Sequence, residues 1–63
     1  MSVEDLYRVL HEYTEVEIKL KSSTVWSGIA KYIPSSFFNK RVNVMYALND
    51  TYDAFIRIEI DAD

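Results

Sequence analysis

The sequence predicts a single α+β domain, in which an N-terminal helix packs on a four-stranded antiparallel β-meander or small curled barrel. Three observations predict this fold. Apolar residues recur at helical spacing near the N-terminus, four later segments alternate between apolar and polar residues, and only short connections separate these segments. A chain of 63 residues has room for one hydrophobic core, so we expect residues 1–63 to form one domain.

The helix is expected over residues 3–13. Its apolar side chains recur every three or four residues and therefore gather on one face; they are Val3, Leu6, Tyr7, Leu10 and Tyr13. Ser2 stands at the N-cap position, and Asp5 three residues later gives a capping-box pattern. The acidic first turn suits the positive end of the helix dipole.

Four strands are expected after the helix. Residues 15–21 alternate cleanly, whereas residues 24–33 alternate irregularly, so either both faces of that strand are covered or Gly28 marks a β-bulge that exchanges the two faces. Pro34 ends this strand, and residues 34–40 are expected to form a turn with one helical turn inside it. Residues 41–48 and 54–61 alternate again and give the third and fourth strands.

The order of the strands follows from the connections, which are too short for parallel crossovers and therefore favour antiparallel neighbours. One face of the sheet is expected to form the core beneath the helix. The residues expected on that face are Val16, Ile18, Leu20, Val44, Ile56, Ile58 and Ile60.

Composition excludes several classes of protein. Ten acidic and seven basic residues give a net charge of −3, the wrong sign for general binding to a phosphate backbone. No apolar run approaches the roughly 20 residues of a membrane span, and no secretory signal is visible, so we expect a cytoplasmic protein without a membrane partner. Cysteine is absent, and a small chain without disulfides or metals is commonly stabilised by self-association, so we expect a homo-oligomer.

No catalytic or metal-binding residue is expected. His11 is the single histidine, the residue type best suited to acid–base catalysis at neutral pH, but it falls on the solvent side of the predicted helix, away from any nucleophile. Glu59, Asp61 and Asp63 share one side of a strand, but a straight strand does not surround a cation, so we interpret them as a solvated face. We therefore expect no enzyme and no cofactor.

Aromatic residues provide the first candidate binding surface. Phe55 lies opposite the isoleucine side of its own strand, and Trp26 lies opposite Val25 and Ile29. Together with Tyr32 they predict an exposed aromatic patch, which is typical of an interaction surface. The patch has three interpretations: a seam between identical subunits, a surface for another protein, or additional core.

Basic residues provide the second candidate. Lys19, Lys21, Lys31 and Arg41 are interspersed with aromatic residues, and they favour a nucleotide held between subunits. Such interspersion also suits single-stranded nucleic acid, and a helix followed by a β-meander matches Sm-like barrels in outline. The acidic balance and the lack of the glycine and Asn-Asp pattern of their RNA-binding loops make nucleic acid the least favoured ligand.

The chain also resembles the short uncharacterised proteins encoded by bacteriophages and mobile elements of Gram-positive bacteria. The segments that carry this resemblance are Met1-Ser2-Val3-Glu4-Asp5-Leu6, Val9-Leu10, Val16-Glu17-Ile18, Trp26-Ser27-Gly28, Ile33-Pro34-Ser35, Phe38, Val42 and Ile56-Arg57-Ile58-Glu59-Ile60. The resemblance implies an accessory protein without catalytic residues. It also implies that the protein acts in the host cytoplasm by binding a host or anti-phage defence protein, or by sequestering a nucleotide signal.

Overall fold

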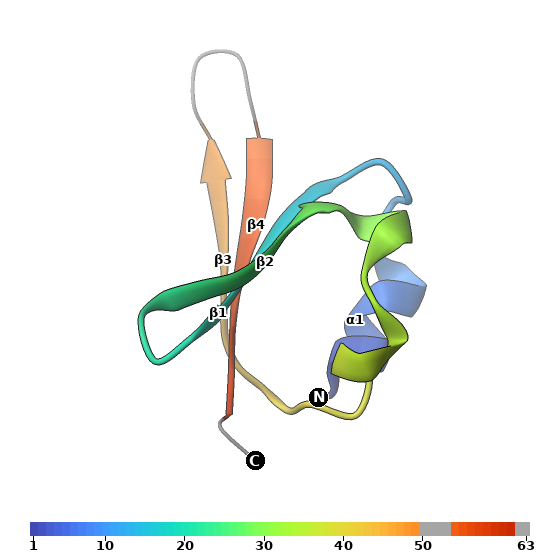
Figure 1. Ribbon diagram of the computed structural model, residues 1–63. Helices are drawn as coiled ribbons and strands as arrows, with labels where there is room; N and C mark the ends of the chain where they lie inside the picture. Colours follow the sequence, from blue (N-terminus) through green and yellow to red (C-terminus); the bar gives the residue numbers. More distant parts are fainter. Residues whose placement is uncertain (50–53, 62–63) are drawn as a thin grey trace.

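The computed structural model describes residues 1–49 and 54–61. These residues form one α-helix, two short 3-10 helices and an open sheet of four strands, so the predicted α+β class is confirmed. Figure 1 shows the helical segments on one side of the sheet. In chain order the elements are α1 (Val3–Val9), β1 (Glu15–Leu20), β2 (Ser23–Ile29), η1 (Ala30–Tyr32), η2 (Ser35–Phe37), β3 (Val42–Asn49) and β4 (Ala54–Ile60).

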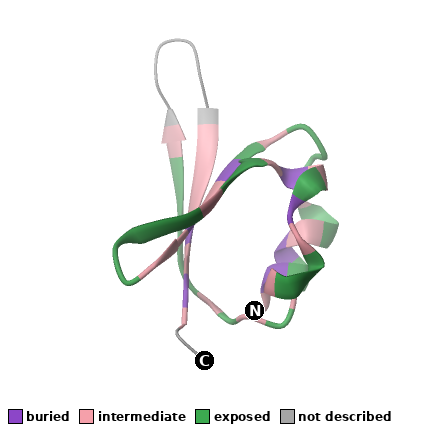
Figure 2. Cartoon of the chain, viewed as in Figure 1, coloured by how far each residue is buried: buried purple, intermediate pink, exposed green. Residues whose placement is uncertain are grey.

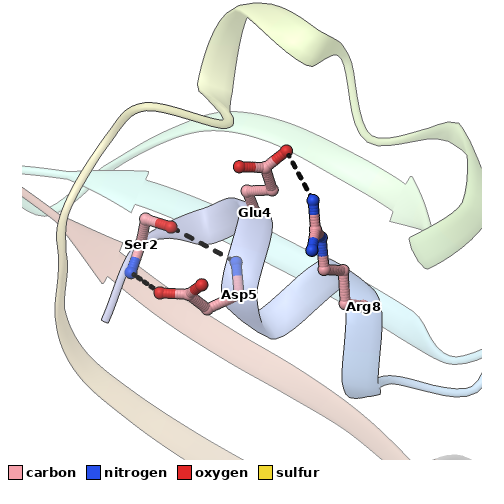
Figure 3. Close-up of polar contacts among 4 residues, drawn as sticks. All are labelled: Ser2, Glu4, Asp5 and Arg8. Carbon is pink, nitrogen blue, oxygen red and sulfur yellow. Dashed lines mark hydrogen bonds and ion pairs between the residues drawn. The ribbon is translucent and has the colours of Figure 1, made fainter.

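The start of α1 follows the predicted capping box. The backbone N–H of Asp5 donates to the Ser2 hydroxyl over 3.2 Å, and the backbone N–H of Ser2 donates to the Asp5 carboxylate over 3.0 Å (Figure 3). One turn further on, Arg8 and Glu4 form an exposed ion pair with an N–O distance of 3.5 Å. The two Ser2–Asp5 hydrogen bonds satisfy backbone N–H groups that a helix start otherwise leaves without partners.

The helix ends at Val9, four residues earlier than predicted, because the backbone that follows pairs with another part of the chain. Leu10 is extended, with ψ of 144°. The carbonyl of Glu12 accepts a hydrogen bond from Lys31, and the carbonyl of Thr14 accepts one from Ala30. Hydrogen bonds of residues 12–14 to η1 thus replace the hydrogen bonds that a longer helix would form.

The order of strands in the sheet is β2-β1-β4-β3, and the prediction of an antiparallel meander or curled barrel is wrong in this respect. β1 and β4 lie side by side in parallel, while the β1–β2 and β3–β4 pairs are antiparallel hairpins. The physical reason lies in residues 30–41, which include both 3-10 helices and lead the chain past the sheet. This connection is long enough to deliver β3 to the far edge, from which β4 returns to the centre.

Two irregularities in the ladders determine which side chains face the helix. In β2 the register shifts so that Ile18 pairs with Trp26 and Lys19 pairs with Thr24, which leaves Val25 as the extra residue. The bulge therefore lies three residues before Gly28, and Trp26 shares the helix side of the sheet with Ile18. The predicted strand over 24–33 is also too long, because residues 30–32 form η1.

A second bulge lies between Val42 and Val44 at the start of β3. Val42 pairs with Ile60 on the helix side, whereas Val44 pairs with Glu59 on the opposite side. The prediction that Val44 belongs to the core face is therefore wrong, because one extra residue exchanges the two faces of all that follows. Val44 is 37% exposed.

The core is small and lies between the helical segments and β1 and β4 (Figure 2). Ile18 and Ile58 are fully buried neighbours at its centre, and Val3 of α1 is also fully buried. Among the described residues, the buried hydrophobic ones are Val3, Leu6, Val16, Ile18, Ala30, Ile33, Ile58 and Ile60. The core thus uses one face of the sheet, and the other face remains available for contact.

Candidate functional site

The candidate site is the face of the sheet that points away from α1, η1 and η2, which we call the outer face. Alternate residues of each strand lie on it, as the strand registers define. Among the described residues, no helix or loop covers this face (Figure 1). Its residues are Glu15, Glu17 and Lys19 of β1, Thr24, Ser27 and Ile29 of β2, Val44, Tyr46 and Leu48 of β3, and Phe55, Arg57 and Glu59 of β4.

An ion pair joins the two central strands in the middle of the outer face. Nε of Arg57 donates to Oε1 of Glu17 over 2.9 Å, and both side chains are partly buried. The two residues are direct partners in the parallel ladder. The Arg57 guanidinium also lies 6.0 Å from the centre of the Phe55 ring, within the range of a cation–π contact. These contacts fix the arginine on the surface of the sheet.

A second polar contact joins β3 to β4. The Tyr46 hydroxyl donates to Oε2 of Glu59 over 2.8 Å. This hydrogen bond and the negative charge of Glu59 raise the pKa of Tyr46 above its ordinary value of 10.0. Since Tyr46 and Glu59 are diagonal neighbours across the ladder, the contact also holds the Tyr46 ring against the sheet.

Two shallow hollows flank the Glu17–Arg57 pair. The first, of about 390 Å³, has Phe55 and Ile29 as its large apolar groups and Glu15 at its border; its remaining lining residues are Val16, Glu17, Ser27 and Gly28. The second, of about 310 Å³, is more polar and is lined by Lys19, Ser22, Tyr46, Leu48, Arg57 and Glu59. The outer face thus offers apolar and aromatic groups on both sides of a fixed ion pair.

The aromatic residues singled out in the sequence do not form one patch. Phe55 lies on the outer face, but Trp26 lies on the helix side and packs against the core. The indole lies along β2 over Gly28, where a Cβ would be 3.0 Å from Cζ2 of Trp26. Tyr32 is 65% exposed in η1, outside the sheet. The interpretation of Trp26 and Phe55 as one surface is therefore wrong.

The four basic residues are also separated. Lys19 lies on the outer face beside the second hollow, whereas Lys21 forms the turn between β1 and β2. Nζ of Lys31 lies 4.8 Å from the ring centre of Tyr13 and 5.0 Å from that of Tyr32. Arg41 pairs with Ser2 through the backbone just before β3. Of the seven residues chosen from sequence, only Phe55 and Lys19 share the outer face.

The residues that organise this face, above all Arg57, Glu17, Tyr46 and Glu59, were not among the site residues predicted from sequence. A signal was present in the charges, since Glu17 and Arg57 each follow an apolar residue in an isoleucine-containing strand and have opposite sign. Recognising it required the parallel pairing of β1 and β4. Alternation alone puts Tyr46 on the same side of the sheet as Val44, and it does not reveal the bulge that turns both side chains to the outer face.

Residues 1–49 and 54–61 were also compared with the requirements of a metal site, a histidine-based site and a membrane span. No group of three histidine, aspartate or glutamate side chains there could hold a metal ion, and Asp63 of the predicted acidic set lies outside the described residues. His11 is exposed and accepts a hydrogen bond at Nδ1 from the backbone of Tyr13. In the same part of the chain, no helix has the length and apolar character to cross a membrane. No family model, curated protein or solved structure matched the chain.

Proposed function

We propose that this protein acts by binding another protein through the outer face of its sheet, without catalysing a reaction. The observation that carries the proposal is the exposed set of apolar and aromatic groups on a sheet face that no described segment covers. Val44 and Tyr46 are 37% and 42% exposed, and Phe55 and Leu48 are partly exposed. Apolar and aromatic groups around satisfied polar pairs are the usual composition of a protein interface.

Charge supports a protein partner over a nucleotide. The outer face carries three carboxylates, Glu15, Glu17 and Glu59, against the two cations Lys19 and Arg57. Glu17 already neutralises Arg57 through their hydrogen bond. An anionic ligand would therefore meet one unpaired cation among acidic groups, whereas a partner with an apolar surface and a basic group opposite Glu15 would be complementary.

The resemblance to short bacteriophage proteins suggests which kind of partner to test. We propose that it is a host or anti-phage defence protein, and that binding inhibits it. A rigid, uncovered sheet face suits this role because its side chains are fixed by the ladder before the partner arrives, which lowers the entropy cost of association.

The test is capture of partners from a lysate of a Gram-positive host by the immobilised protein and by two variants. Phe55→Ser removes the largest apolar group of the first hollow, and Val9→Ser is the matched control on α1, where Val9 is 75% exposed. We expect at least a tenfold loss of the captured partner with Phe55→Ser and none with Val9→Ser, with both variants folded by circular dichroism. Equal capture by all three proteins would remove the outer face from consideration.

A further inference from the structure

The distribution of charge between inner and edge strands is inverted in this sheet. All charged residues of the four strands lie on the two inner strands, β1 with the sequence EVEIKL and β4 with AFIRIEI. The edge strands, β2 with STVWSGI and β3 with VNVMYALN, carry none. Proteins commonly place charged residues, especially lysine, or proline on edge strands to prevent pairing with another chain. Neither edge here carries that protection.

The edge of β3 is covered at its start and open after that. The N–H of Val42 donates to the carbonyl of Met1 over 2.8 Å, and the N–H of Val3 donates to the carbonyl of Lys40 over 2.9 Å. These bonds lie on the side of the chain away from β4. Along residues 43–49, no described segment pairs with this edge. The open length is therefore the second and larger part of β3.

Exposure along β3 shows how much side-chain surface its open edge leaves uncovered. Val44, Met45 and Tyr46 are 37%, 49% and 42% exposed, although their side chains alternate between the two faces of the sheet. Exposure on both faces at consecutive residues arises from the open edge, because β4 covers these side chains from one direction only. A strand added at that edge would cover all three.

We infer that a second copy of this chain pairs antiparallel with the open edge of β3, giving a two-fold symmetric dimer with one continuous eight-stranded sheet. An isologous contact places each residue of β3 opposite a residue of the same strand, so any charge on β3 would meet a like charge nearby. β3 has no charge and meets this condition. β2 meets it less well, since its bulge at Val25 lies inside the strand, whereas the bulge of β3 lies at its start, before Val44.

The cover by the N-terminal residues determines the register. Two residues that lie opposite each other in an antiparallel pair point to the same face of the sheet. When both strands are copies of β3, opposite residues must therefore be an even number of positions apart, and the two-fold axis passes at one residue of β3 and not between two residues. The middle of the open stretch 43–49 is Tyr46. Tyr46 then lies opposite its own copy, Val44 opposite Leu48 on the outer face, and Met45 opposite Ala47 on the helix side.

The expected dimer is weak and sensitive to salt. A single strand pair buries less surface than a standard interface, so a micromolar dissociation constant is expected. Each chain has a net charge of −3, and the two chains repel each other. Since the seam is uncharged, added salt screens this repulsion and strengthens the dimer. The inference does not depend on the proposed function.

The test is sedimentation equilibrium of the full chain from micromolar to millimolar concentration. Met45→Lys places a charge at the seam on the helix side and leaves the outer face unchanged, so partner capture reports on the proposed function separately. We expect it to raise the dissociation constant of the dimer at least tenfold. Val25→Lys is the matched control on the other edge, because Val25 is 43% exposed and also uncharged.

A mixing experiment identifies the seam. Met45→Lys and Met45→Glu are each expected to be monomeric, and an equimolar mixture is expected to form a heterodimer, because the opposite charges at position 45 are then diagonal neighbours on one face of the pair, within reach of long side chains. A wild-type chain that stays monomeric at millimolar concentration would overturn the inference. So would dimers that persist in Met45→Lys, dimers lost in Val25→Lys, or a mixture of the two variants that remains monomeric.

Discussion

Ile18 and Ile58 offer the sharpest test of the fold, because they are neighbours only if β1 and β4 are adjacent. They are direct partners in the parallel ladder, and both are fully buried. In the antiparallel meander that the sequence predicts, these residues would lie on opposite edges of the sheet. A double-mutant cycle with Ile18→Val and Ile58→Val therefore measures the pairing itself.

The magnitudes follow from the burial of both side chains. Removing one buried methyl group by Ile→Val costs about 0.5–1.5 kcal/mol, and residues in contact couple by at least about 0.5 kcal/mol. A domain of 63 residues has a free energy of unfolding of roughly 3–9 kcal/mol, and the double variant loses about 1–3 kcal/mol, so it keeps a measurable transition over most of this range. Alanine is avoided because each Ile→Ala change would cost about 2–5 kcal/mol.

The assay is urea unfolding followed by circular dichroism at two protein concentrations, which separates folding from association. With a slope of about 1 kcal/mol/M, a coupling of about 0.5 kcal/mol moves the midpoint by roughly 0.5 M. The control cycle pairs Ile18→Val with Val44→Ala, since Val44 lies on the other face and on a strand that does not touch β1. Strict additivity for Ile18 and Ile58, or equal coupling in the control, would refute the parallel arrangement.

Three further predictions concern single residues. Ser2→Ala removes the acceptor for the Asp5 N–H and should lower the free energy of unfolding by about 1 kcal/mol in urea. Hydrogen bonds from the Ser2 N–H and hydroxyl lower the pKa of Asp5. The stabilisation from the Asp5 carboxylate is therefore present above the ordinary pKa of 3.8 and lost as pH falls through the lower pKa of the folded state. Ser22→Gly should raise stability by about 1 kcal/mol, since Ser22 has φ of 71° in the turn between β1 and β2; a lower urea midpoint would contradict this. In an ultraviolet titration, the difference between wild type and Tyr46→Phe should show a phenol that ionises above pH 10.0, because Glu59 raises the pKa of Tyr46. The stabilisation from the Tyr46–Glu59 hydrogen bond should be lost as pH rises through the raised pKa of the folded state. Ionisation at or below pH 10.0 would disprove this prediction.

The helix and strands of this fold could be predicted from sequence, but the order in which the strands lie side by side in the sheet could not. Alternation located β1, β3 and β4, and the Ser2–Asp5 pattern located the start of the helix, whereas irregular alternation placed the end of β2 at residue 33 instead of Ile29. A period of two says which residues share a face without saying which strand lies alongside, so the parallel β1–β4 pair was missed. Bulges at Val25 and after Val42 leave no mark in composition, and each reverses the faces of the residues beyond it.

The candidate site was predicted less well for the same reason. Phe55 and Lys19 lie in regular stretches of strand, and both reached the predicted side of the sheet. Trp26 lies beyond a bulge and was assigned to the wrong side. The Glu17–Arg57 pair joins residues 40 positions apart in the chain, and no local pattern connects them.

The place of β4 has a consequence for synthesis of the protein. β4 is the last strand along the chain, yet it lies between β1 and β3, and β3 pairs with no other strand in the part of the chain described. Until residues 54–60 have left the ribosome, a nascent chain has one hairpin and an uncharged strand without a partner. The β1–β4 and β3–β4 ladders therefore cannot form before β4 is available, and a chain that is stalled before residue 54 should be digested rapidly by protease.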